Sequence, residues 1–495
     1  MIRVASGAGA LDVLREAATL ELVVDTVLLV AGVVVAAIVV AVPTAWLVAR
    51  TDLPGRRLWA VAAALPLVIP SYVAAFCLLG LFGERGLAAE VLGLERLPDP
   101  TGYWGALAAL TLSTYPYVFL LAQAAFRDLD PALEEAARGL GHSRRRVVWR
   151  VTVPAVRPSV TLGSLLVALY VLSDFGVVSL MRYDSLTRAI YLQYRSLFDR
   201  TPAAALALVL VLLTAIALAL ELRARTRGRL WRTGPGAARR SPLVRLGRYR
   251  WLALGWCVSV TGAFLVLPAV VLGYWLTRGL ANDRIVGLPW NEAVNSLGAS
   301  GLAAAAAALA AVPVALLATR YPSRVSRTLE RLSYAGNALP GLVIALSLVF
   351  FAARYASPVY QTLALLVFAY VVRFFPQALS GIDTALARTG PRLEEASRGL
   401  GRGPVATTWL VTLPLVRSGL VAGAALVFLS AMKELPATIL LRPIGFDTLA
   451  TEVWSATQVG AYSQAATPAL LLIALSAPVL WLLQNERGRV AEAPG

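Results

Sequence analysis

Two stretches of this chain, DPALEEAARGLG at residues 130–141 and GPRLEEASRGLG at residues 390–401, are near copies that lie 260 positions apart. The same offset relates matching positions on both sides of them: Pro116 with Pro376, Pro131 with Pro391, Trp149 with Trp409, Pro154 with Pro414, Arg157 with Arg417, and Asp174 with Glu434. One offset held over about 60 residues indicates an internal duplication rather than chance. The fold is therefore expected to consist of two like halves.

The composition is that of an integral membrane protein. Hydrophobic residues make up 58% of the 495 residues and charged residues 15%, against about 45–50% and about 25% in soluble proteins. The apolar residues gather in runs of about 20, the length that crosses a bilayer core of about 30 Å. Eleven candidate spans lie near residues 22–49, 58–82, 103–126, 159–181, 203–222, 251–276, 294–319, 331–353, 358–380, 417–432 and 463–483. We therefore expect an all-α polytopic membrane protein.

Arginines lie mainly on one side of the predicted spans. If residues 127–158 are cytoplasmic, the segments on that side carry 31 Arg, and the opposite side carries 12 Arg and Lys433. By the positive-inside rule the N-terminus is then outside and the C-terminus cytoplasmic. The first apolar run follows acidic residues and has full span length, so no signal peptide is evident.

Both repeats are expected to insert in the same orientation. VDT at 24–26 answers VNS at 294–296, six spans later. LPLVIP at 65–70 answers LPGLVI at 339–344, after a longer loop at 83–102 in the first half. Parallel repeats are related by a pseudo-two-fold axis along the membrane normal. We expect the two halves to face each other across a central path.

Several kinds of chemistry are excluded by scarce residue types. Cys77 and Cys257 lie in apolar runs and build neither a disulfide framework nor a metal site, and the single histidine, His142, leaves no His-based zinc site. The one lysine, Lys433, is followed by Glu434, whereas a Walker A loop needs Ser or Thr there. The net charge of +17 sits in the loops, which favours lipid surfaces over nucleic acid as its partner. We expect neither catalytic residues nor a bound metal.

Each half carries one long polar segment between its third and fourth core spans. In the first half a helix is expected to begin at Pro131, with acidic residues in its first turns. Gly141 then ends that helix, and a second amphipathic piece runs to Pro154. The second half repeats this pattern, so both segments are expected to form rigid helical elbows.

These segments resemble the signature of the inner-membrane permeases of binding-protein-dependent ABC importers, which is EAA, three residues, G, nine residues and I-x-L-P. Both copies match at every spacing, with Val for Ile at 151 and 411, Val for Leu at 153 and Ser for Ala at 397. The resemblance covers about residues 22–483 and implies the type I permease fold of ABC importers. In that family the elbow is a coupling helix that docks in a groove of a separate ATPase. The residues implied in ATPase coupling are Glu134, Glu135, Ala136, Ala137, Gly141, Pro154, Glu394, Glu395, Ala396, Ser397, Gly401 and Pro414.

The resemblance also implies partners and a mechanism. A homodimeric cytoplasmic ABC ATPase would use ATP and Mg²⁺, so this chain would be a transport subunit that binds no cofactor and is no enzyme. Closure of the ATPase would move the elbows and swing the halves from inward-facing to outward-facing, through its different affinity for the two states. A soluble extracytoplasmic binding protein would deliver the solute. The chain would lie in a bacterial inner membrane, in contact with lipid.

Two further stretches, SDFGVVSL at 173–180 and KELPATILLRPIGFDTLAT at 433–451, look like the ferric iron branch of these permeases. Asp174, Lys433 and Glu434 lie there near span ends, and charge within a membrane is by default a functional hypothesis. They are candidates for a gate or the translocation path, with a structural pairing of Lys433 and a carboxylate as the alternative. Arg373 is expected to reach the cytoplasmic interface.

The predicted organisation follows the chain from end to end. It comprises an outer N-terminal segment (1–21), a first permease repeat (22–222) with its coupling loop (127–158), an Arg-rich cytoplasmic linker (223–250), an extra transmembrane helix (251–276), a second repeat (277–484) with its coupling loop (381–417), and a cytoplasmic tail (485–495). Relatives usually begin with a helix like the extra one and have twelve spans. Either this helix has been lost here or the start codon has been placed too late.

Three other functions compete with ferric iron import. A permease for thiamine or another small solute would have the same architecture. An ion-coupled secondary transporter would use the same spans but gives no reason for paired elbows. An intramembrane enzyme would need His, Ser-Lys or paired Asp within the spans, and such candidates are few.

Overall fold

The computed structural model describes residues 16–83, 86–93, 99–196, 201–228, 243–282, 287–336 and 339–492. Most of the predicted N-terminal segment, the middle of the Arg-rich linker and the last three residues lie outside these ranges. Ten helices within the described residues are long and apolar enough to cross a membrane. The chain divides into two compact units, residues 1–284 with 460–466 and residues 285–459 with 467–495. Each unit is described by itself.

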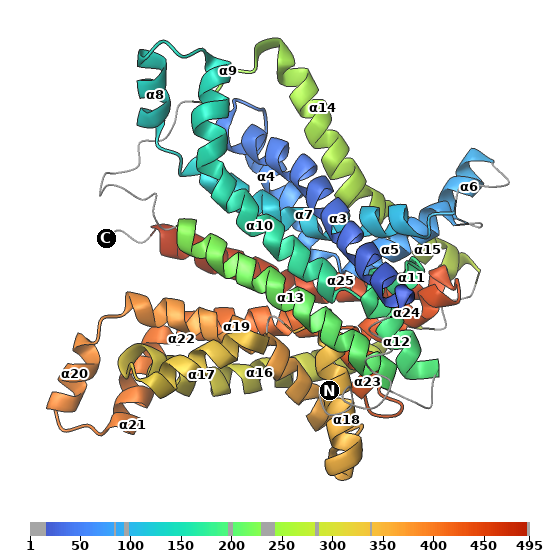
Figure 1. Ribbon diagram of the computed structural model, residues 1–495, viewed down its shortest axis with the longest axis vertical. Coiled ribbons are helices and arrows are strands. Elements are labelled where there is room, and N and C mark those ends of the chain that lie inside the picture. The colour runs from blue at the N-terminus through green and yellow to red at the C-terminus, as the bar shows by residue number, and fades with distance from the viewer. Residues whose placement is uncertain are drawn as a thin grey trace. The chain divides into compact units, whose positions relative to one another are not determined.

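The first unit contains the first repeat and the helix that follows it (Figure 1). Its elements are α3 (Ala17–Arg50), α4 (Arg56–Ala64), η1 (Leu65–Val68), α5 (Ser71–Phe82), α6 (Leu87–Leu92), α7 (Tyr103–Arg127), α8 (Pro131–Gly139), α9 (Arg144–Val147), η2 (Val148–Thr152), α10 (Val153–Ser173), α11 (Gly176–Leu180), α12 (Leu186–Ser196), α13 (Thr201–Gly228), η4 (Gly247–Tyr249), α14 (Arg250–Thr261), η5 (Gly262–Val266) and α15 (Leu267–Ala281).

The second repeat follows the same order of elements. They are α16 (Trp290–Arg320), α17 (Arg324–Ala335), α18 (Gly341–Tyr355), η7 (Ser357–Val359), α19 (Leu363–Arg388), α20 (Arg392–Gly399), α21 (Pro404–Thr407), η8 (Thr408–Thr412), α22 (Leu413–Met432), α23 (Pro436–Leu441), α24 (Leu449–Gln458) and α25 (Tyr462–Glu492). Thus α16 corresponds to α3, α19 to α7, α20 to α8 and α22 to α10. The duplication predicted from one sequence offset is present at the level of secondary structure.

Small side chains bring the long helices of each unit together. In the first unit α3 packs on α7 and α10, and in the second α16 packs on α19 and α22. The buried stripe of α3 recurs every fourth residue: Leu29, Val33, Ala37, Ala41 and Ala45. The corresponding stripe of α16 consists of alanines: Ala299, Ala303, Ala307, Ala311 and Ala315. Small residues allow close backbone approach, which is the main source of helix association within lipid.

One glycine in each repeat lies at a close crossing of two helices. A Cβ on Gly163 of α10 would lie 2.7 Å from the Cα of Val118 in α7. A Cβ on Gly423 of α22 would lie 3.0 Å from the Cα of Ala378 in α19. These residues are related by the 260-residue offset, so both repeats require glycine at the same crossing.

Two predicted spans are broken helices. Residues 58–82 divide into α4, η1 and α5, with Pro70 directly before α5. Residues 331–353 divide into the end of the polar α17 and most of the apolar α18, which is shorter than a full span, with Pro340 directly before α18. Proline donates no backbone hydrogen bond and disfavours helical conformation in the residue before it. The prolines at the two breaks, Pro70 and Pro340, are 270 positions apart, so the breaks correspond, but the expected match of LPLVIP with LPGLVI was four residues out of register.

The extra helix, predicted near 251–276, packs on the first repeat. It runs through α14, η5 and α15, and these elements contact α3, α4 and α5. The Trp256 indole donates to Thr44 Oγ1 at 3.0 Å, and the Trp275 indole donates to the Gly80 carbonyl at 3.0 Å. This helix follows the first repeat in sequence and completes the first unit.

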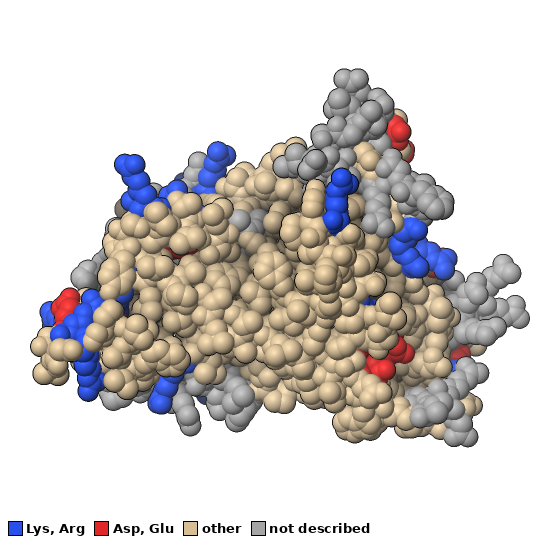
Figure 2. Space-filling model, turned by 90° about the horizontal axis from the view of Figure 1, so that it is seen from below, with Lys and Arg blue, Asp and Glu red and all other residues tan. Residues whose placement is uncertain are grey.

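Charged side chains are unevenly distributed over the surface. Figure 2 shows a face whose broad middle carries almost no Lys, Arg, Asp or Glu, while these residues gather at one end and along the edges. Many large apolar side chains of the long helices are exposed, among them Val35, Val39, Leu212, Leu302 and Leu309. An uncharged, apolar surface of this kind is suited to contact with lipid tails.

Candidate functional site: two elbows and two buried acidic clusters

The predicted elbows are present in both repeats. In Figure 1, α8 and α9 project beyond the end of α10, and α20 and α21 project beyond the ends of α19 and α22. The Asp130 side chain accepts a hydrogen bond from the Ala132 amide and caps α8, which begins at Pro131. Gly141 and Gly401 have φ of 81° and 83°. This left-handed conformation favours glycine and turns the chain at the end of the elbow helix.

A π-helical stretch joins each elbow to the following membrane helix. These stretches are η2 (Val148–Thr152) and η8 (Thr408–Thr412), and each ends two residues before a proline, Pro154 or Pro414. The proline nitrogen cannot donate the regular i→i−4 hydrogen bond. The wider π-helical turn accommodates the missing donor. It explains why the predicted motif ends in a proline. Such π-bulges often occur at functional sites.

In the first unit a buried ion pair ties the elbow to the end of α3. Arg50, the last residue of α3, donates from Nη2 to Glu134 Oε2 at 2.5 Å, with side chains 5% and 11% exposed. The Thr152 hydroxyl donates to the other oxygen of Glu134 at 2.8 Å. Glu134 therefore joins three elements, α3, α8 and η2. This carboxylate therefore connects the elbow directly to the end of α3.

The second unit repeats the ion pair with a different arrangement of donors. Arg320, the last residue of α16, donates from Nε to both oxygens of Glu394, at 3.2 and 3.1 Å. Its Nη2 also donates to the Thr389 carbonyl at 2.8 Å. Ser397 and Thr407 share a hydrogen bond of 3.1 Å inside the same elbow. Arg50 and Arg320 were not singled out from the sequence, although they are 270 positions apart, the offset that also relates Pro43 to Pro313.

The predicted coupling residues fall into an inward and an outward group. Glu134, Glu394, Ala137 and Ser397 are buried within their own units. Glu135, Ala136, Glu395 and Ala396 are exposed, as are Gly141, Gly401, Pro154 and Pro414. Large apolar side chains accompany the outward group: Leu140 is 80% exposed, Leu400 82%, Trp149 73% and Trp409 63%. The exposed glutamates thus lie on elbows that also present apolar side chains to the outside.

At the other end of α10, Asp174 acts as a helix cap. Its Oδ1 accepts from the Val177 amide at 2.8 Å at the start of α11. Its Oδ2 accepts from the Ser71 hydroxyl at 2.5 Å, and Ser71 is the first residue of α5. Asp174 therefore fixes the start of α11 against the helix break at Pro70. These hydrogen bonds show its structural role.

Glu434 occupies the same place in the second unit with different partners. Its Oε1 accepts from the Ala437 amide at 3.2 Å at the start of α23, and from Arg373 Nη1 at 2.5 Å. The position of Ser71 is taken by Gly341, where a Cβ would overlap the Arg373 guanidinium. Lys433 is the C-cap residue of α22.

The expectation for Arg373 was wrong. It lies about 15 Å along α19 from Leu363 and farther still from the elbow end, and its guanidinium pairs with Glu434. The predicted span at 358–380 ended too early, because α19 continues to Arg388. The buried carboxylate of Glu434, at the start of α23, lies closer to the Arg373 guanidinium than the membrane interface does.

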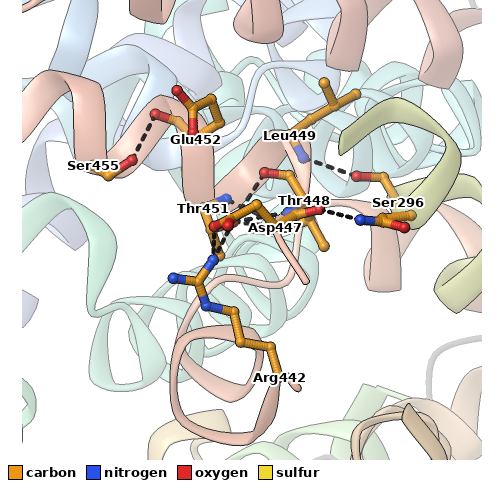
Figure 3. Close-up of polar contacts among 9 residues, drawn as sticks. Ser296, Arg442, Asp447, Thr448, Leu449, Thr451, Glu452 and Ser455 are labelled. Carbon is orange, nitrogen blue, oxygen red and sulfur yellow. Dashed lines mark hydrogen bonds and ion pairs between the residues drawn. The ribbon is translucent and has the colours of Figure 1, made fainter. Parts of the chain in front are cut away.

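The short segments after α11 and α23 are held to the first helix of each repeat. Ser296 of α16 accepts from the Leu449 amide at 2.9 Å, and the Asn295 side chain donates to the Asp447 carbonyl at 2.9 Å (Figure 3). Thr26 of α3 likewise accepts from the Leu186 amide at 3.0 Å. Thr26 and Ser296 are the third residues of VDT and VNS. From the sequence, VDT and VNS were predicted only to mark where the repeats begin. In the structure, their third residues hold the segment that follows the fourth core helix.

Acidic groups gather beside this segment in the second unit. Arg442 pairs with Asp447, and the Ser455 hydroxyl donates to the Glu452 carbonyl (Figure 3). Burial raises the pKa of the Glu452 carboxyl, the nearby Glu292 raises it further, and Arg442 opposes the rise. Within the described residues, no three His, Cys, Asp or Glu side chains lie together as a metal site.

Two like sets of membrane-crossing helices, each with an elbow tied to its first helix, define a duplicated membrane transport protein. The chain belongs to the family of binding-protein-dependent transport system inner membrane components, whose model matches residues 22–223 and 311–487.

Individual relatives agree with this assignment. A Fe(3+)-transport system permease protein of Haemophilus influenzae is 32% identical over 468 residues, 94% of this chain and 90% of the relative. The ferric transport system permease protein of Actinobacillus pleuropneumoniae is 23% identical over 86% of this chain and 65% of the relative. The molybdenum transport system permease protein of Escherichia coli K12 is 35% identical over 138 residues, 27% of this chain and 58% of the relative.

Proposed function

We propose that this chain is the permease subunit of an ATP-driven importer of ferric iron. Its two elbows would each dock on one subunit of a homodimeric cytoplasmic ATPase that binds ATP and Mg²⁺. A soluble binding protein would deliver the iron to the opposite side of the membrane. The 32% identity over 94% of this chain to the Fe(3+)-transport system permease protein of Haemophilus influenzae supports iron as the solute.

The docking proposal rests on one observation: in each elbow, one of two adjacent glutamates is buried and the other is exposed. Glu134 and Glu394 are buried and hold the elbows to α3 and α16. Glu135 and Glu395 are exposed beside exposed leucines. A surface that combines a carboxylate with apolar side chains suits a protein groove with basic and apolar parts. Each elbow thus has an inward residue that transmits movement and an outward residue that meets the partner.

The proposed mechanism follows from this connection. ATP binding closes the ATPase dimer and draws the elbows with it. The Arg50–Glu134 and Arg320–Glu394 pairs pass that displacement to α3 and α16, whose alanine-rich stripes pack on the other core helices. The ATPase can shift the two membrane states only by its difference in affinity for them.

The proposed orientation places the elbows and the C-terminus in the cytoplasm and the N-terminus outside, in a bacterial inner membrane. The excess of arginine on the elbow side supports it. Asp174, Lys433 and Glu434 would then lie toward the outer ends of the fourth core helices. Because Asp174 and Glu434 cap helices, we propose that they stabilise the gate region and leave metal selection to the binding protein.

The proposal is tested by uptake of labelled ferric iron in cells that lack this chain. Wild type and a variant with Glu16→Ala plus Glu21→Ala should restore uptake, because these exposed glutamates lie at the start of α3, away from the elbows. A variant with Glu135→Ala plus Glu395→Ala, present in the membrane at the same level, should not. If wild type fails to restore iron uptake but restores uptake of labelled thiamine, the iron assignment is wrong and the importer architecture stands.

A further inference from the structure

A cavity of about 960 Å³ lies in the first unit beside the elbow. Its walls come from the end of α3, from the segment between α8 and η2, from residues 244–249 and from the start of α14. Residues 244–249 are fixed there: the Val244 amide donates to the Arg50 carbonyl at 2.8 Å, and the Asp52 amide donates to the Val244 carbonyl at 3.2 Å. The walls of the cavity therefore come from four segments that meet at the elbow end of this unit.

Aromatic and aliphatic side chains form most of the lining. Trp46 reaches it from α3, and Trp251, Leu252 and Trp256 reach it from α14. Trp251 is 77% exposed and Leu252 75%, so large apolar surface remains open to the cavity and its mouth. Both helices cross the membrane and end here, which is the depth at which tryptophans prefer to lie.

The charged part of the lining is strongly positive. Arg50 and Glu134 neutralise each other in their buried pair. Arg138, Arg145 and Arg245 also line the cavity, and all three are exposed. The cavity thus combines three cationic groups with an apolar, tryptophan-rich wall.

We propose that this cavity binds one anionic phospholipid from the leaflet on the elbow side, with its phosphate at the three arginines and an acyl chain along the tryptophans of α14. Basic pockets between membrane helices on the cytoplasmic side bind anionic headgroups in this way. The volume is within the range of ligand sites. The side of the membrane rests on the proposed orientation, whereas the lipid class rests on the lining alone.

The site is particular to the first repeat. One of its walls is α14, which belongs to the first unit and contacts α3 and α4. Arg145 corresponds to Val405 in the second repeat, and Arg398, the counterpart of Arg138, donates to the Tyr321 hydroxyl at 2.8 Å. Because Arg138, Arg145 and Thr152 belong to the elbow segment, a bound lipid restrains the first elbow and leaves the second unaffected.

The experiment is native mass spectrometry of the full-length chain, released from detergent after incubation with phosphatidylglycerol or phosphatidylcholine. We expect one tightly retained phosphatidylglycerol and weaker retention of phosphatidylcholine. The variant Arg145→Gln plus Arg245→Gln should bind phosphatidylglycerol at least about tenfold more weakly than wild type does. The matched control Arg327→Gln plus Arg331→Gln removes two exposed arginines from α17 and should behave as wild type.

A second variant tests the cavity without changing charge. Gly255 lines the cavity, and a Cβ there meets no atom within 4 Å. Gly255→Phe should fill the space and reduce phosphatidylglycerol retention while the chain remains monodisperse. Equal retention of both lipids, or equal loss in the control variant, would overturn the proposal. So would displacement of the lipid by millimolar inorganic phosphate, which would assign the arginines to a soluble anion. Iron uptake is not part of this test, so its outcome is independent of the transport proposal.

Discussion

The two repeats agree at their elbows and differ where their fourth core helices end. At the elbows, Arg50 pairs with Glu134 and Arg320 pairs with Glu394, in corresponding places. At the other end, Asp174 is held by the hydroxyl of Ser71. Its counterpart Glu434 is held by the guanidinium of Arg373, and Ser113 stands at the position of Arg373 in the first repeat.

Three positions change together to produce this difference. Ser71, Ser113 and Asp174 in the first repeat correspond to Gly341, Arg373 and Glu434 in the second. Loss of the side chain at Gly341 leaves room for the guanidinium, and the longer carboxylate reaches it. A charge within the membrane is costly unless it is paired. Duplicated elements therefore stay alike where both must transmit the same movement, and they diverge where each half can satisfy its buried acid in its own way.

The largest effect is expected from breaking the Arg373–Glu434 pair of the second repeat. Arg373→Ala leaves Glu434, whose side chain is 5% exposed, without its counter-charge. Removal of one partner of a buried pair costs about 3–5 kcal/mol. Ser71→Ala removes one hydrogen bond to a charged group, worth about 1.5–3 kcal/mol. Thermal unfolding of the purified chain in detergent should rank the two variants in this order.

Glu434→Gln in the Arg373→Ala background provides the matched control. It removes the unpaired charge and should recover much of the lost thermal stability. Equal losses for Ser71→Ala and Arg373→Ala would mean that the ionic pair adds nothing beyond a hydrogen bond, and that the divergence of the repeats is neutral.

The elbow pairs should respond alike in the two repeats. Arg50→Ala and Arg320→Ala each remove one partner of a buried ion pair, which costs about 3 kcal/mol, the lower end of the range for such pairs, because the exposed elbow lets water reach the glutamate. Each should also reduce iron uptake, since its elbow no longer transmits movement to α3 or α16. Limited proteolysis should show earlier cleavage at the affected elbow only. If one of these variants leaves uptake unchanged, the connection proposed for that repeat is incorrect.

A smaller and again symmetric effect is expected at the ends of the elbow helices. Gly141→Ala and Gly401→Ala place a side chain at positive φ, which costs about 1–2 kcal/mol. Gly139→Ala and Gly399→Ala are the controls, because these glycines lie within α8 and α20 with open space around them. The controls should be neutral or slightly stabilising. Comparing the melting temperatures of the four variants checks this, and a control as damaging as its partner would count against the turn geometry.

The smallest effect concerns the acidic segment of the second repeat, where Glu452 corresponds to Ala189 of the first. The pKa of the Glu452 carboxyl is raised in the folded chain. Ionisation of this carboxyl therefore lowers the free energy of unfolding as the pH rises above the ordinary carboxyl range. Glu452→Gln should therefore stabilise the chain near neutral pH and make no difference below about pH 4. The half-exposed site limits the gain to less than about 1 kcal/mol. Melting curves at several pH values check the sign, and a loss of stability at neutral pH would contradict it.

The duplication and the elbows could be predicted from the sequence because they rest on local signals. The offset of 260 residues, the prolines before the elbow helices and Gly141 with Gly401 are all visible in one chain. Their structural consequences, two like sets of helices and a left-handed turn in each elbow, are confirmed. The assignment to importer permeases is confirmed by the family match.

Long-range partners could not be predicted in the same way. Arg50 and Glu134 are 84 positions apart, and Arg373 and Glu434 are 61 apart. Which of two adjacent glutamates turns inward depends on where the end of α3 lies, and no periodicity in the elbow encodes that position. Arg373 was misplaced for the same reason. Its partner is set by the helix break before Gly341, which the sequence marks only as a matching proline motif.

The central claim is that one chain supplies both docking elbows for an ATPase pair. The native cysteines Cys77 and Cys257 are buried, so single cysteines introduced as Glu135→Cys and Glu395→Cys can be crosslinked selectively to the ATPase with a thiol-to-amine reagent. We expect each single variant to capture one ATPase subunit and the double variant to capture two per permease chain, while Glu16→Cys captures none. Complexes that contain two permease chains for each ATPase pair would contradict it.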